Sequence, residues 1–207
     1  MSFIDTIDEA DANEEVRAMY DRQSSFYGFL PNYAKVFSHR PECMKLWADL
    51  QNGVRRHMDR RRFELITFVA AHALRSTLCS LAHGKALAKY LSQEDVLRLA
   101  RGEFPDSLSV AEVAIVMFTR KMSRNASDIV ATDVERLREH GLSDAEVFDV
   151  AAVAAARAFW TKVLESLGVE ADAPFHDMDA EFKHTLACGR PLSFRAHGAA
   201  VTAGVLP

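Results

Sequence analysis

The sequence has few cysteines and no long apolar or basic run, and each shortage excludes a class of protein. Three scattered cysteines, an odd number among 207 residues, cannot form a disulfide framework and favour a reducing cytoplasm. The longest apolar stretch is interrupted by Arg157 before it reaches the length of a membrane span, and no basic segment followed by an apolar run opens the chain. We therefore expect a cytoplasmic protein with no membrane segment and no secretory signal.

Basic residues are slightly outnumbered, with 25 Lys and Arg against 29 Asp and Glu, and they form no continuous stripe. Nucleic-acid binding needs such a stripe, so we expect no nucleic-acid partner. The nine glycines are dispersed without the spacing of a phosphate-binding loop, so no nucleotide cofactor is expected. The remaining partners are small molecules and other protein chains.

The hydrophobic spacing is helical along most of the chain, and no segment alternates strictly as a half-buried strand does. The sequence therefore predicts an all-α fold. Caps and periodicity place helices at residues 13–24, 33–37, 41–57, 59–74, 76–90, from 92, and at 110–122, 132–140 and 143–167. Glycine and proline break the pattern after residue 170, which predicts a helical domain over 1–170 and an irregular C-terminal extension over 171–207, or one ordered by a partner.

Residues 91–96 (LSQEDV) are similar to residues 142–147 (LSDAEV), and each follows an amphipathic helix. The similarity indicates either a weak internal helical repeat or two copies of a common helix start. Serine followed by acidic residues is favoured at any helix N-terminus.

One group of residues has the composition of a reactive site. If Ser76 caps a helix, Cys79 lies in its first turn, where free backbone N–H groups and the helix dipole favour a thiolate. His83 is one turn further along the same face, so a base accompanies the thiol as in activated nucleophiles. Glu64 would orient or relay protons for the imidazole if a tight turn near Arg75 pairs the two helices. Against this, a lone helical cysteine is usually a small buried hydrophobic residue.

His72 could join a polar pocket with these residues, and Cys, His and Glu can all bind metals. The spacing fits no standard metal motif, so we expect no metal. A cluster of arginines at positions 55, 56, 60, 61 and 62 is interpreted as a solvated turn with salt bridges to acidic neighbours.

The pattern Glu64-x11-Ser76-x2-Cys79-x3-His83 resembles the Glu-x11-Cys-x2-Cys-x3-His signature of the alkylhydroperoxidase D (AhpD)-like and carboxymuconolactone decarboxylase superfamily. Residues 28–32 (GFLPN) and 133–144 are similar to its peroxidase-related subgroup, and the resemblance covers residues 13–169. It implies an AhpD-like helical fold that assembles into dimers, trimers or hexamers. It also implies that Cys79 reacts with hydroperoxides while His83 and Glu64 relay protons.

Ser76 departs from this pattern, because it stands where the family has the cysteine that closes the disulfide. An oxidised Cys79 would have to be resolved by Cys43, by Cys188, by an external thiol or by a neighbouring subunit. Two further alternatives stay open. One is a lyase that acts on a small organic acid, with His83 and Glu64 as acid and base, and the other is a scaffold that has lost its chemistry.

Overall fold

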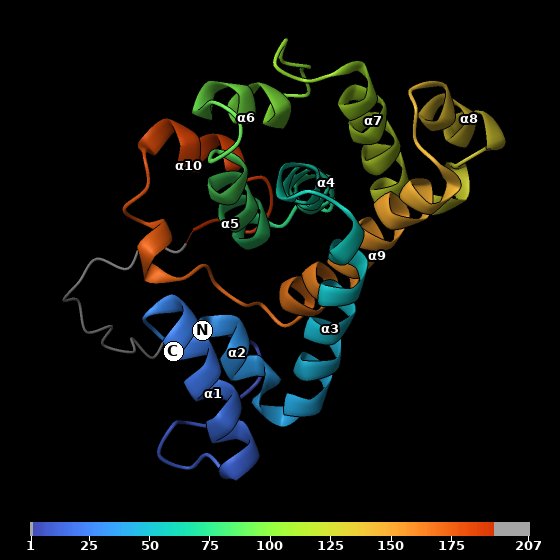
Figure 1. Cartoon of the computed structure of the whole chain (residues 1–207). Coiled ribbons are helices and arrows are strands. Elements are labelled where there is room, and N and C mark those ends of the chain that lie inside the picture. The colour runs from blue at the N-terminus through green and yellow to red at the C-terminus, as the bar shows by residue number, and fades with distance from the viewer. Residues whose placement is uncertain (1, 193–207) are drawn as a thin grey trace, which may run out of the picture.

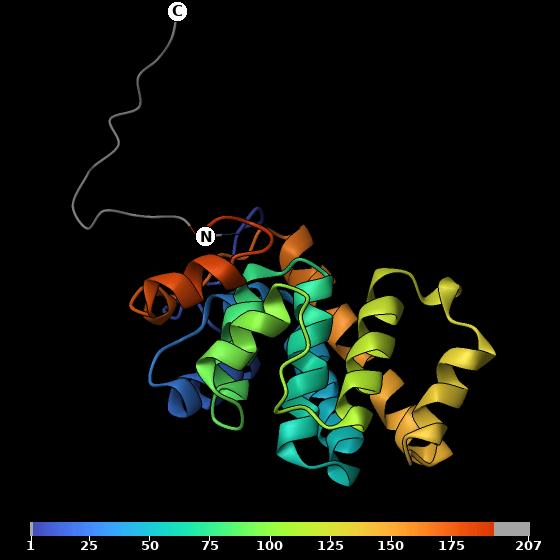
Figure 2. The ribbon, with the colours of Figure 1, turned by 90° about the horizontal axis from the view of Figure 1, so that it is seen from above.

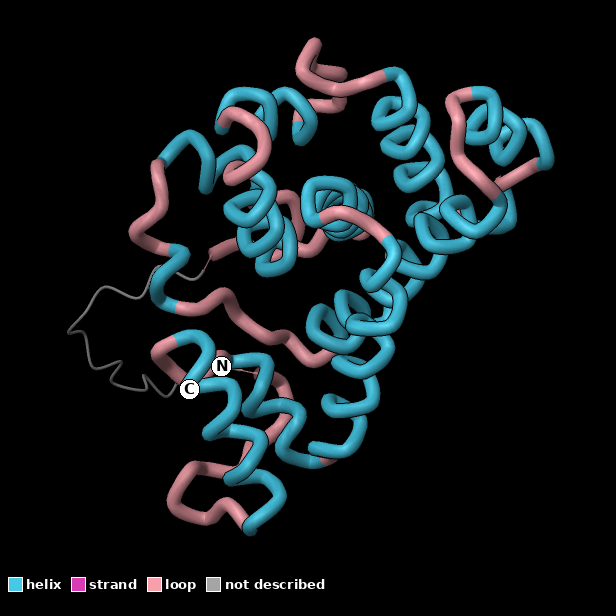
Figure 3. The backbone as a smooth tube through the Cα atoms, viewed as in Figure 1, coloured by secondary structure: helices cyan, strands magenta, loops and turns pink. Residues whose placement is uncertain are grey.

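The computed structural model describes residues 2–192 and confirms the all-α prediction (Figures 1 and 3). Residues 2–192 contain no strand. Within the same residues, no helix combines the length and hydropathy needed to cross a bilayer. The α-helices, in chain order, are α1 (Glu14–Tyr27), α2 (Asn32–Val36), α3 (Pro41–Val54), α4 (Arg60–Ala73), α5 (Thr77–Leu87), α6 (Gln93–Ala100), α7 (Val110–Arg124), α8 (Ala131–Glu139), α9 (Asp144–Ser166) and α10 (Ala180–Leu186).

Side-chain caps explain where many of these helices begin. Asn13 and Asp59 accept backbone N–H groups at the starts of α1 and α4, and Ser109 forms a capping box with Glu112 at the start of α7. The two similar segments of the sequence are both capped helix starts, at α6 and α9. The weak internal repeat itself stays a prediction.

Helix α4 lies at the centre of the molecule, with α5, α7 and α9 around it (Figures 1 and 2). Residues 63–71 are all buried, which is typical of a helix that packs on every side. Different faces of α4 contribute to three hydrophobic clusters. Ala71 joins the cluster of α1, α2, α3 and α9, Phe68 joins that of α5, α6 and α10, and Ile66 joins that of α7, α8 and α9.

The expectation of an irregular extension after residue 170 is wrong for the residues that the structure describes. Asp179 caps α10, and Phe182 and Leu186, four residues apart, bury their side chains against α5 and α6. Figure 2 shows α10 lying beside these two helices. Two apolar residues on one helical face are enough to dock a short helix, although they are too few to show as periodicity among prolines and glycines. Residues 193–207 lie outside the described residues, and a domain boundary after residue 170 stays a prediction.

The segment that leads into α10 is tied to the N-terminal half. The Asp172 carboxylate accepts the backbone N–H of Asn32 at 2.7 Å, and the Asn32 side chain donates to the carbonyl of Glu170 at 3.2 Å. A carboxylate at the first turn of α2 is also favoured by the helix dipole. These bonds fix the path of the chain from α9 across α2 toward α5.

Candidate active site

The site is built on the turn between α4 and α5. Arg75 adopts the left-handed conformation with φ 59°, and the Ser76 N–H donates to the carbonyl of Ala71 at 3.1 Å, which closes the end of α4. Glycine is the usual residue in this conformation, and arginine there is strained. The turn is short enough to bring α5 back alongside α4.

Ser76 caps α5 as the sequence predicts. Its hydroxyl accepts the N–H of Cys79 at 3.4 Å, so Cys79 is the third residue of the helix and lies in its first turn. The Cys79 side chain is 2% exposed and packs in the cluster that contains Ala71, Trp160 and Leu164. The cap and the dipole therefore act on a sulfur that is shielded from water.

Glu64 and His83 form a pair across α4 and α5. Nδ1 of His83 lies 2.8 Å from Oε2 of Glu64, and Nη2 of Arg60 is 3.7 Å from the other carboxylate oxygen. Burial raises the pKa of Glu64, but the hydrogen bond from His83 and the nearby positive charges outweigh it and hold this pKa below its usual value. Burial and the charge of Arg157 lower the pKa of His83 despite its carboxylate partner. A neutral imidazole that donates from Nδ1 to a carboxylate keeps Nε2 as a proton acceptor.

Arg157 on α9 is a site residue that the sequence analysis did not assign. Nη1 of Arg157 lies 3.9 Å from Sγ of Cys79, and its guanidinium carbon is 5.6 Å from the ring centre of Trp47. The residue is 4% exposed, and its Nε atom has no hydrogen-bond partner among residues 2–192. The sequence does contain one indication of a buried charge here, because Arg157 is the one charged residue in the run from Val150 to Trp160.

The burial of Arg157 has an electrostatic consequence. A buried guanidinium is unfavourable unless negative charge lies nearby. The positive charge of Arg157 lowers the pKa of Glu64, and a Cys79 thiolate would supply a second negative charge. The helix N-terminus and the guanidinium of Arg157 thus both present positive charge to the sulfur of Cys79.

The structure brings the predicted residues together as two pairs, Glu64 with His83 and Ser76 with Cys79. Cys79 and His83 lie one turn apart on α5, and within the described chain no hydrogen bond joins the sulfur to the ring. His72 does not join them, because its side chain lines a separate cavity beside α6 and α7. No group of three or more metal-binding side chains was found in residues 2–192.

The other two cysteines lie in different surroundings. Cys43 is exposed at the start of α3, and Sγ of Cys188 contacts the Ser80 hydroxyl at 3.4 Å. All three thiols are free. Ser80 directly follows Cys79 in α5. Cys188 therefore lies against the same turn of the helix, but its contact is with Ser80.

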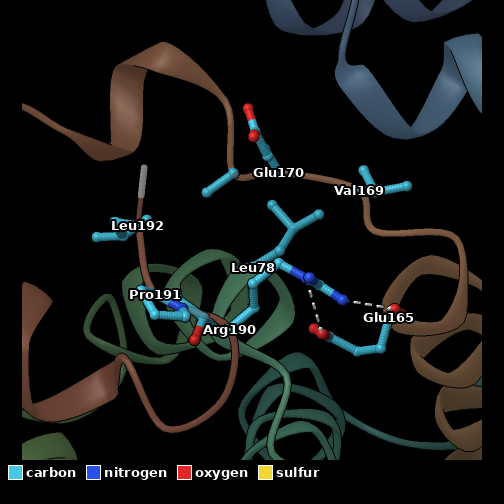
Figure 4. Close-up of a pocket in the computed structure, with 9 residues that line it drawn as sticks. Leu78, Glu165, Val169, Glu170, Arg190, Pro191 and Leu192 are labelled. Carbon is cyan, nitrogen blue, oxygen red and sulfur yellow. Dashed lines mark hydrogen bonds and ion pairs between the residues drawn. The ribbon is translucent and has the colours of Figure 1, made fainter. Parts of the chain in front are cut away.

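The chain after α10 covers the start of α5. Gly189 donates to the Thr77 hydroxyl at 3.1 Å, and it packs so closely on the carbonyl of Arg75 that a side chain there would overlap with backbone. Figure 4 shows Arg190 extending toward Glu165, with Nη2 of Arg190 at 3.0 Å from the Glu165 carbonyl. The cavity that remains beside Leu78 measures about 10 Å³, roughly the space of one water.

The pKa shifts of the Glu64–His83 pair predict how stability depends on pH. Because the pKa of His83 in the folded chain lies below the ordinary value of 6.5, the unfolded chain takes up this proton first as the pH falls, and the free energy of unfolding falls with it. The pKa of Glu64 is also lowered in the folded chain. Its contribution to stability is complete above the ordinary value of 4.5 and is lost as the pH falls from there through the folded value.

His83→Gln keeps an N–H donor for Glu64 and removes the titration of the imidazole. We expect the parent protein to lose more unfolding free energy than this variant between pH 7 and pH 5, as measured by urea denaturation; equal losses would contradict the assignment.

The sequence matches no protein-family model and no curated protein. Solved structures do match, and they show that the chain has the AhpD-like fold, as the resemblance of its sequence predicted. One neighbour is described as an alkylhydroperoxidase AhpD core and an uncharacterized peroxidase-related protein from Ralstonia eutropha JMP134. It is 20% identical, with a TM-score of 0.73 over 91% of this chain and 98% of that chain.

Two further neighbours have the same fold. An uncharacterized peroxidase-related protein from Silicibacter sp. TM1040 is 21% identical, with a TM-score of 0.73 over 86% of this chain and 95% of its own. The debrominase Bmp8 is 15% identical, with a TM-score of 0.67 over 87% of this chain and 94% of its own. A cysteine-to-alanine variant of Bmp8 has been solved in complex with 2,3,4-tribromopyrrole.

Proposed function

We propose that this protein reduces hydroperoxides with Cys79 as the reacting thiol. The observation that carries the proposal is the position of its sulfur, in the first turn of α5 and 3.9 Å from the guanidinium of Arg157. A helix N-terminus and a neighbouring cation are the surroundings in which cysteines act as nucleophiles. The AhpD-like fold supports this class of chemistry.

The first half of the reaction needs one base and one acid. The Cys79 thiol loses its proton to Nε2 of His83, directly or through a water, and the thiolate attacks the terminal oxygen of the hydroperoxide. A sulfur–oxygen bond forms as the oxygen–oxygen bond breaks, and the alkoxide that leaves takes a proton from the imidazolium. The products are a Cys79 sulfenic acid and an alcohol. The Glu64 carboxylate, 2.8 Å from Nδ1, stabilises the imidazolium between the two proton transfers.

The second half of the reaction needs an external thiol. Ser76 cannot form a disulfide, and Cys188 contacts Ser80 instead of Cys79. We propose that a dithiol attacks the sulfenic sulfur and releases water, after which its second thiol displaces the Cys79 thiolate and leaves the dithiol oxidised. Dithiothreitol is the simplest reductant with which to test this step.

A halogenated aromatic is the second candidate substrate, because Bmp8 has the same fold and Cys79 lies beside an aromatic group in this protein. Trp47 stacks on Trp160 with ring centres 3.9 Å apart, and the Trp47 ring also contacts the guanidinium that faces the sulfur. Consumption of 2,3,4-tribromopyrrole in the presence of dithiothreitol, without any consumption of hydroperoxide, would favour this candidate.

The experiment that tests the proposal traps the oxidised sulfur. The protein is treated with one equivalent of hydrogen peroxide or tert-butyl hydroperoxide in the presence of dimedone, and the labelled cysteine is found by mass spectrometry. We expect the label on Cys79. We also expect Arg157→Met to slow labelling about tenfold, which corresponds to about 1.4 kcal/mol in activation free energy. Methionine keeps most of the buried volume, so the fold should persist.

Arg98→Met is the matched control, because Arg98 pairs with Glu103 on the surface of α6. This change should leave the labelling rate as it is. Labelling on Cys43 or Cys188 in place of Cys79, or an unchanged rate in Arg157→Met, would refute the proposed role of the Cys79–Arg157 pair.

A further inference from the structure

A second cavity lies beside α4, lined by Phe68 and His72 and not by Ala71, which packs in the cluster of the cysteine. Its volume is about 150 Å³, and it is lined by the end of α4, the end of α6 and the last turns of α7. The lining contains four basic side chains and no aspartate or glutamate: His72, Arg101, Arg120 and Arg124. The rest of the lining is apolar or glycine. None of the residues of the Cys79 site contributes to it.

The positive charge of this cavity is not neutralised from within. Arg124 forms no ion pair with any residue in the described part of the chain, and Arg120 donates to the carbonyls of Leu99 and Gly102, at 2.6 and 3.3 Å, instead of to a carboxylate. Arg101 is paired with Glu94 and with Glu181, and neither of these carboxylates is part of the lining.

The pKa shifts of Arg120 and His72 agree with an excess of positive charge in the lining of the cavity. Burial and then the charge of Arg124 lower the pKa of Arg120, and burial followed by the charges of Arg120 and Arg124 lowers the pKa of His72. The His72 ring makes no hydrogen bond to the residues that the structure describes, although it lies against the Phe68 ring with the centres 5.9 Å apart. A bound anion would relieve the repulsion among these groups.

The shape of the cavity restricts the anion. Phe68, Val69, Leu99 and Ala100 supply an apolar wall that an inorganic ion would leave uncovered. A cavity of about 150 Å³ can hold one benzene ring, whereas drug-sized ligands need at least about 300 Å³. We propose that the cavity binds a small organic monocarboxylate, with its apolar body against the Phe68 wall and its carboxylate toward Arg124 and His72.

Benzoate is the probe for this site, and calorimetric titration of the full chain is the measurement. We expect benzoate to bind and Arg124→Gln to weaken it about tenfold, or about 1.4 kcal/mol. Arg124 is exposed at the end of α7, so the substitution should not disturb folding. Arg22→Gln makes the same change of charge on an exposed position of α1, and it should leave the affinity unchanged.

Two further ligands separate the requirements for charge and for the apolar body. Benzyl alcohol has the ring without the charge, and inorganic phosphate has charge without the ring, so both should bind at least tenfold more weakly than benzoate. Equal affinity of either ligand, or an unchanged benzoate affinity in Arg124→Gln, would overturn the proposal. Dimedone labelling of Cys79 is independent of Arg124, so the failure of this site is distinguishable from the failure of the proposed peroxidase reaction.

Discussion

Cys79→Ser is expected to abolish the dithiothreitol-dependent consumption of tert-butyl hydroperoxide. A serine hydroxyl does not ionise near neutral pH and forms no analogue of the sulfenic acid, so neither half of the reaction can take place. The loss should exceed a hundredfold and reach the uncatalysed rate. Serine is also close to cysteine in size, and the site is 2% exposed, so circular dichroism should show that the fold is kept. Turnover is measured as the hydroperoxide that remains over time.

Cys43→Ser and Cys188→Ser are the matched controls, since each makes the same chemical change outside the proposed pair with Arg157. Both variants should retain turnover if an external dithiol resolves the sulfenic acid. Loss of turnover in Cys188→Ser alone would show that this thiol is the resolving group. Full activity in Cys79→Ser would refute the peroxidase proposal. Conversion of a small lactone acid by both the parent protein and Cys79→Ser would instead favour a lyase that uses Glu64 and His83.

The local part of this site could be predicted from the sequence because local interactions determine it. The Ser76 cap places Cys79 in the first turn of α5, and the cap depends on residues only three apart. A tight turn near Arg75 was the condition for pairing the two helices, and the structure contains that turn. The Glu64–His83 contact then follows from the return of α5 along α4, since the two residues are nineteen positions apart on adjacent helices.

Arg157 and α10 could not be placed in this way. Arg157 is 78 positions from Cys79, and its contact with the sulfur depends on how α9 packs in the cluster that contains Cys79. A charged residue within an apolar run indicates a buried charge, but it does not reveal the partner. Helix α10 has seven residues, fewer than an isolated helix needs, so tertiary contacts stabilise it and its periodicity is too short to detect.

Leu186→Ala is expected to lower the free energy of unfolding by about 2 to 5 kcal/mol. Leu186 is fully buried on α10, and a methyl group added at Gly84 of α5 would overlap with it, so the two helices are in close contact. Truncation leaves a cavity next to Phe68 and Gly84, where α5 and α10 pack closely. Because a whole domain is stable by only about 5 to 15 kcal/mol, the change should be plain in urea denaturation.

Leu46→Ala is the control for this prediction, because Leu46 is 66% exposed on α3 and should cost no more than about 0.5 kcal/mol. A similarly small effect of Leu186→Ala would mean that α10 is only loosely attached. A large effect has a consequence for the active site as well. The segment that follows α10 reaches Thr77 and Arg75 through Gly189, so α10 anchors the chain that covers the first turn of α5. Leu186→Ala should therefore also speed the labelling of Cys79 by dimedone after peroxide treatment, since loosening this segment gives the oxidant easier access to the sulfur.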